Sequence, residues 1–222
     1  AGINWIATDE EILFNTIKLQ QSKTITEIPK AILYQPYRVE KLSKAGEMKS
    51  VNIIFRDKAL SDAIGFVYHN WEPQAAVKDF ITKLLQIGQN FYASETKGKC
   101  FISVILDGEN CWESYKNDGW DFLSELYKRI SEQPEIETVT ISEFLSKYPA
   151  EITLHRLFPG SWINANFGIW IGHPEDNLAW EYLTKARNFF DTYIKNHPDK
   201  KDSPEVKNAF EELLIAEGSD WC

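Results

Sequence analysis

The chain has 222 residues, of which 43% are hydrophobic and 26% are charged, so it can form one or two globular domains with a buried core. Its net charge of −9 argues against nucleic acid and anionic membranes as partners, because both bind basic surfaces. The sequence shows no signal peptide, no apolar run near the roughly 18 residues that span a bilayer and no metal or disulfide spacing of its cysteines, so we expect a cytoplasmic protein.

Hydrophobic periodicity and turn residues predict strands that alternate with helices along the chain. In chain order the predicted elements are strand 2–8, helix 8–19, strand 31–34, strand 51–55, helix 60–66, helix 73–91, strand 100–106, helix 120–130, strand 137–141, helix 143–147, strand 152–157, helix 173–195 and helix 203–213. Thr8 and Glu11 are the predicted capping box of the first helix, and the acidic run 9–11 is interpreted as favouring that helix start. The alternation is typical of an α/β fold with a mainly parallel sheet or barrel.

The strand predicted over residues 100–106 is almost entirely apolar and is followed at once by Asp107, Gly108 and Glu109. A continuous apolar run of this length predicts a parallel strand that is buried on both faces. Asp107 would then stand at its C-terminal end, where α/β folds collect ligands and catalytic groups. Asp-Gly is also ordinary turn chemistry, so this pattern alone leaves a purely structural interpretation open.

The sequence contains no phosphate-binding glycine motif, no HExxH pair and no GxSxG nucleophile motif, and its four histidines are scattered. We therefore expect neither a metal nor a cofactor. The carboxylates that follow predicted strands, together with an aromatic content of 14%, suit glycoside chemistry, in which one carboxylic acid protonates the leaving oxygen and a second carboxylate attacks. The loop 159–172 mixes Trp, Asn and Gly, a composition that favours ligand binding.

Several strings resemble glycoside hydrolase family 57, and they occur in order along nearly the whole chain. These strings are WIATDE (5–10), RDKALSDAIGF (56–66), LDGENCWE (106–113), PGSWINAN (159–166), WIG (170–172) and AEGSDW (216–221). The resemblance implies an incomplete (β/α)7 barrel that acts on α-glucans by a retaining mechanism, as in the amylases, amylopullulanases, branching enzymes and glucanotransferases of that family. The implied substrates are starch, glycogen, maltooligosaccharides and pullulan.

The resemblance also implies roles for individual residues. Asp107 corresponds to the general acid/base of the family. The positions that correspond to substrate-site strings are Glu109, Trp112, Trp162, Asn164, Glu217, Asp220, Trp221, Arg56 and Asp62. Asp57 and Asn166 match the same strings without an implied role.

The family's nucleophilic Glu has no counterpart in this sequence, because its motif is expected just upstream of residue 1. We therefore expect residues 1–222 to be one α/β domain that forms the C-terminal half of a larger catalytic barrel. On this interpretation the isolated chain is inactive, and it either self-associates through an uncovered strand edge or covers that edge with its own helices.

Two alternatives stay open at this point. A carbohydrate-binding or structural module would keep the scaffold without turnover. A polysaccharide deacetylase relative would need an Asp-His-His metal cluster, which the scattered histidines disfavour. The sequence does not distinguish hydrolysis from glucanosyl transfer, or α-1,4 from α-1,6 preference.

Overall fold

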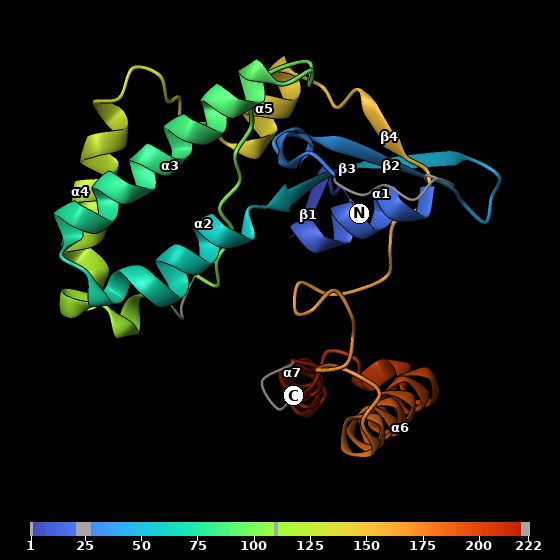
Figure 1. Cartoon of the computed structure of the whole chain (residues 1–222). Helices are drawn as coiled ribbons and strands as arrows, with labels where there is room; N and C mark the ends of the chain where they lie inside the picture. The colour runs from blue at the N-terminus through green and yellow to red at the C-terminus, as the bar shows by residue number, and fades with distance from the viewer. Residues whose placement is uncertain (1, 21–27, 109–110, 219–222) are drawn as a thin grey trace. The chain divides into compact units, whose positions relative to one another are not determined.

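The computed structural model describes residues 2–20, 28–108 and 111–218, and they divide into two compact units, residues 1–165 and 166–222 (Figure 1). The α-helices and β-strands are β1 (Trp5–Asp9), α1 (Glu10–Gln20), β2 (Tyr37–Leu42), β3 (Met48–Arg56), α2 (Lys58–Asp62), α3 (Pro73–Ala93), α4 (Trp120–Ser131), α5 (Ile141–Lys147), β4 (Ile152–Leu154), α6 (Pro174–Asn196) and α7 (Pro204–Ala216). The expectation of one domain over residues 1–222 stays a prediction.

The sheet of the first unit has the strand order β1-β3-β2-β4. β1 pairs with β3 in parallel and β2 pairs with β4 in parallel, whereas β2 runs antiparallel to β3. The predicted α/β class with mainly parallel strands is therefore confirmed. Because β1 and β3 are parallel, their C-terminal ends lie at the same edge of the sheet, with Asp9 opposite Arg56.

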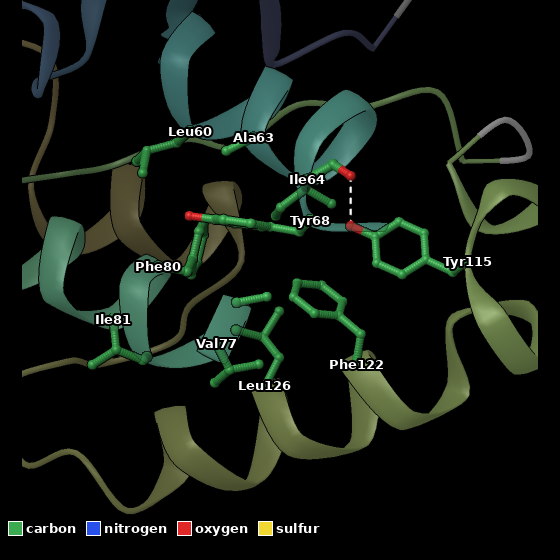
Figure 2. Close-up of a cluster of buried hydrophobic side chains, with 11 residues drawn as sticks. Leu60, Ala63, Ile64, Tyr68, Val77, Phe80, Ile81, Tyr115, Phe122 and Leu126 are labelled. Atoms are coloured by element: carbon green, nitrogen blue, oxygen red, sulfur yellow. Dashed lines mark hydrogen bonds between the residues drawn. The ribbon is translucent and has the colours of Figure 1, made fainter. Parts of the chain in front are cut away.

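Two apolar clusters form the core of the first unit. One lies against the sheet and contains residues of α1, β2 and β3, such as Leu13, Tyr37 and Phe55. The other lies among α2, the π-helical turn η2 (Ala63–Val67), α3 and α4, where Tyr68 and Phe122 pack against each other (Figure 2). Ile87 and Ile102 touch both clusters, so the two form one continuous interior.

The second unit is a pair of helices, α6 and α7, preceded by turns. Phe190 and Phe210 stack with ring centroids 5.7 Å apart and join the two helices. Arg187 of α6 donates to Glu217 at 3.0 Å, and the Trp180 indole donates to the Trp170 carbonyl at 2.9 Å. No helix in the described part of the chain is both long and apolar enough to cross a membrane.

The sequence predicted the long helices well and the short apolar segments poorly. Residues 31–33 lie in a 3-10 helix (η1, Lys30–Leu33), which Tyr34 follows, and residues 31–34 form no strand. Residues 137–141 form no strand because Thr140 caps α5 in a capping box with Glu143. The strand β2 lies between the predicted strands 31–34 and 51–55, where no element was predicted. The first-turn cap of α1 is Asp9, which accepts from the Glu11 amide at 2.9 Å, instead of Thr8.

The predicted strand over residues 100–106 is also wrong. These residues are half-buried and form no ladder. The reason is the register of β3, whose residues 48–53 are already paired with β2. Only the last residues of β3, 54–56, are free on the side of β2, which is too few for a ladder with residues 100–106. Just after the end of β3, the segment makes a backbone hydrogen bond, in which the Ser103 carbonyl accepts from the Asp57 amide at 2.9 Å.

The buried cluster of Figure 2 gives a direct test of this packing. Phe122 on α4 is only 2% exposed, whereas Tyr127 on the same helix is 67% exposed. We expect Phe122→Ala to lower the free energy of unfolding by about 3–5 kcal/mol, because it removes a buried ring and leaves a cavity. Tyr127→Ala, the control, should change it by less than about 0.5 kcal/mol in urea titrations. Equal losses in the two variants would contradict the assigned core.

Asp79 on α3 gives a pH-dependent test. Burial alone would raise the pKa of Asp79, but bonds from Lys83 and from the Tyr68 hydroxyl (2.7 Å) outweigh it and lower that pKa below its usual 3.8. A lowered pKa stabilises the fold above the unfolded-state value, and this stability is lost as the pH falls through the folded-state value. Asp79→Asn should therefore cost up to about 1 kcal/mol near neutral pH, and this cost should disappear as the pH falls through the lowered folded-state pKa of Asp79. The exposed Asp202→Asn variant is the control, and a pH-independent difference would refute the assignment.

Candidate functional site

A group of charged side chains occupies the edge of the sheet where β1 and β3 end. Asp9 is fully buried and Arg56 is 5% exposed. The Arg56 Nε atom lies 3.2 Å from Asp9 Oδ2, and the Arg56 Nη2 atom donates to Asp62 Oδ1. The parallel register dictates the first contact, because it makes Asp9 and Arg56 neighbours across the two strands.

Trp162 completes this group from a different part of the chain. The Arg56 guanidinium lies over the Trp162 ring, 5.1 Å from its centroid. The loop that carries Trp162 is tied to α1, since the Phe158 amide donates to Thr16 Oγ1 at 2.9 Å. Gly160 is required in this loop because a Cβ there would lie 2.4 Å from the Ala165 carbonyl oxygen. Arg56, Asp62 and Trp162, all predicted as substrate-site residues, are thus brought together.

Asp57 is as buried as Asp9 but has a different set of contacts. Its Oδ1 atom accepts from the Leu60 amide at 2.9 Å and caps α2. Its Oδ2 atom accepts from the Tyr34 hydroxyl at 2.7 Å and lies 3.3 Å from Lys30 Nζ. Both oxygens are committed to the scaffold, and burial together with Asp57 raises the pKa of Tyr34. Asp57 therefore fixes α2, the helix on which Asp62 lies.

Burial also raises the pKa of Asp9 and of Glu10, which stand where β1 passes into α1. For Asp9, the Glu11 amide and the Arg56 charge oppose the effect of burial. For Glu10, the amide of Lys58, which donates to its Oε2 at 3.0 Å, opposes it. The acidic run does favour the helix start, but Asp9 and Glu10 also connect α1 to the end of β3, which sequence reasoning missed.

Asp107 lies on the surface, directly after the half-buried segment 100–106. This segment is anchored to α2, because the Ile105 amide donates to Ser61 Oγ at 3.2 Å and Ser61 in turn donates to the Asp57 carbonyl at 2.7 Å. On the far side, Cys111 Sγ contacts the Asp107 carbonyl at 3.5 Å. The chain is therefore anchored both before and after Asp107, which lies beside α2, the helix that carries Asp62. Contrary to the prediction from the sequence, Asp107 does not stand at the end of a strand.

The other predicted substrate-site residues have separate surroundings. Trp112 packs against Tyr115 at 5.6 Å on the margin of the helical core. Asn164 lies in a turn with a φ of 54°, and Glu217 is in the second unit, paired with Arg187. The predictions that lie outside the described residues are Glu109, Asp220 and Trp221. Their roles, like those of the residues above, stay predictions.

Among the described residues no three His, Cys, Asp or Glu side chains gather in a way that could hold a metal ion. The arrangement instead offers two partly exposed carboxylates, Asp107 and Asp62, and a partly exposed indole. Carboxylates with an aromatic platform are the groups that glycoside chemistry uses.

Comparison with known proteins decides the family. The family model "Glycosyl hydrolase family 57" matches residues 1–155. The chain belongs to glycosyl hydrolase family 57. The match includes Asp9, Arg56, Asp62 and Asp107, whereas Trp162 lies beyond its end.

Two solved structures have a fold that is similar to that of this family 57 chain. The GH57-type branching enzyme of Pyrococcus horikoshii aligns with 99% of this chain and 45% of its own, at 20% identity and a TM-score of 0.72. The 4-alpha-glucanotransferase of Thermococcus litoralis aligns with 89% of this chain and 27% of its own, at 20% identity and a TM-score of 0.53. This chain thus spans less than half the length of either structure, and both likenesses support the predicted barrel-type fold. No curated protein matches.

The dual role of Asp57 in this family 57 site predicts a specific loss of stability. Asp57→Ala removes the cap of α2, worth about 0.5–2 kcal/mol, and leaves the buried Tyr34 hydroxyl without its acceptor, worth about 1–3 kcal/mol. We expect a combined loss of about 2–4 kcal/mol in the free energy of unfolding.

A double-mutant cycle separates the two parts. Adding Tyr34→Phe to Asp57→Ala should recover the hydroxyl part, because no buried donor is then left unpaired. Strictly additive losses in chemical unfolding would show that the hydrogen bond between the two side chains does not matter.

Proposed function

We propose that this chain carries the general acid/base and part of the substrate site of a retaining glycoside hydrolase or glucanotransferase that acts on α-glucans. The observation that supports it is the placement of Asp107. In a family 57 chain, the residue that corresponds to the acid/base emerges at the surface from a segment anchored on both sides, next to the helix that bears Asp62.

The chemistry assigns Asp107 two steps. As an acid it protonates the glycosidic oxygen while a second carboxylate attacks the anomeric carbon, and as a base it then takes a proton from the water or sugar hydroxyl that releases the glycosyl group. The attacking carboxylate would have to lie about 5–5.5 Å from the Asp107 carboxyl. Hydrolysis and transfer share the first step, so the proposal covers both.

The choice of α-glucan rests on the family and on its solved members. The two similar structures are named as a branching enzyme and a 4-alpha-glucanotransferase, names that describe those proteins. Starch, glycogen, maltooligosaccharides and pullulan are therefore the substrates that we propose to test first. Self-association is part of the proposal too, because β1 is an edge strand with Trp5 and Ile6 partly exposed.

Asp107→Asn tests the proposal in a protein that contains this chain and turns over an α-glucan. The amide cannot transfer the proton, so we expect kcat to fall by about 10²–10⁴-fold with little change in thermal unfolding. Asp118→Asn is the matched control, because Asp118 is exposed in the same region and its φ of 50° suits Asn equally well. Product formation is followed by reducing ends and by chromatography of transfer products.

Near-normal turnover in Asp107→Asn would remove this residue from the chemistry. Tight maltooligosaccharide binding by the unsubstituted protein with no turnover of any α-glucan would instead favour a binding module over an enzyme.

A further inference from the structure

The acid/base chemistry makes no use of Asp9, although Asp9 has an unusual environment. Its carboxylate is 0% exposed and its Oδ2 atom lies 3.2 Å from Arg56 Nε. Within the described residues, neither of these two atoms makes a hydrogen bond. The contact is therefore electrostatic, and it places a buried carboxylate directly beside a buried guanidinium.

The other contacts of Arg56 lead outward from this buried contact. Its Nη2 atom donates to Asp62, whose side chain is 37% exposed, and its plane lies over Trp162, which is 36% exposed. A guanidinium is rigid and planar, so fixing its Nε side also fixes the direction of Nη2 and the orientation of its face. Arg56 itself is only 5% exposed and has little surface with which to meet a polymer.

A purely stabilising ion pair explains this arrangement less well. Removing two charged groups from water costs solvation free energy, and their mutual attraction barely offsets this cost. Apolar residues of similar volume often stabilise a fold equally well. The buried charge of Asp9 gains a function if it sets the geometry of the two partly exposed groups that Arg56 contacts.

We propose that Asp9 is a positioning residue whose buried carboxylate orients Arg56, so that Arg56 holds the Trp162 ring and the Asp62 carboxylate in place to bind an α-glucan. This inference rests on the proposed function, because it names how the substrate site is organised. Trp162 supplies an apolar platform for a sugar face, and Asp62 accepts hydrogen bonds from sugar hydroxyls.

Asp9→Asn in the active protein is the first test. The amide oxygen still accepts from the Glu11 amide, so the cap of α1 is kept while the charge that faces Arg56 is lost. We expect the Kd for a maltooligosaccharide, measured by calorimetry, to rise about tenfold, because the cation–π contact of Arg56 would no longer hold the Trp162 ring in place. KM should rise with Kd, while kcat should change much less. Glu11→Gln is the matched control, since it makes the same chemical change on the exposed Lys58 pair nearby and should leave Kd unchanged.

Coupling to Trp162 separates positioning from stability. If Asp9 acts through Trp162, Asp9→Asn should raise Kd by less than about twofold in a Trp162→Ala background, because the platform is already gone. Equal effects of Asp9→Asn in both backgrounds, or an unchanged Kd in the single variant, would overturn the proposal.

Arg56→Lys provides the second variant if Asp9→Asn folds poorly. It keeps the buried charge pair and loses the planar fork, so we expect affinity to fall while thermal stability is largely retained. Normal affinity in Arg56→Lys would overturn the positioning role. If the unsubstituted protein neither binds nor turns over an α-glucan, both the proposed function and this inference fail. If the unsubstituted protein and all these variants bind an α-glucan with the same affinity, only the inference is refuted.

Discussion

The parallel pairing of β1 with β3 is the constraint on which the rest of the first unit depends. It places Asp9 opposite Arg56 at one edge of the sheet, and each strand then continues directly into a helix. The residues that follow extend the connection, because Glu10 accepts from the Lys58 amide and Asp57 caps α2. One register thus fixes the buried ion pair and the bond between the starts of α1 and α2, and a slip of one residue would separate Asp9 from Arg56 and Glu10 from Lys58.

Much of the fold could be predicted because the helices carry their own signals. The apolar faces of α3 and α4, Pro73 at the start of α3 and the Thr140 capping box are local features that do not depend on distant partners. The sheet depends on such partners. Residues 100–106 have the composition of a buried strand, yet the free edge of β3 beside them is too short to form a ladder with them. Composition cannot show which edges are already paired.

The candidate site was predictable to a similar degree. Asp107, Arg56 and Asp62 stand in strings that carry the family resemblance, so the sequence identified them without showing their contacts. Asp9 was interpreted only as part of a helix start. The signal that points to more is its position: it ends one parallel strand as Arg56 ends the next, and the C-terminal ends of parallel strands meet.

The loop that carries Trp162 shows how a site group can be held without regular structure. Asn164 and Ala165 both have positive φ, a conformation that is costly for residues other than glycine and persists only where the surroundings determine it. Here the surroundings are specific: Ala165 is buried against the sheet cluster, Gly160 leaves room for the Ala165 carbonyl, and the loop begins at a bond to α1. The same sheet cluster that buries Leu13 therefore also fixes the backbone on either side of Trp162, so the indole meets Arg56 from a rigid support.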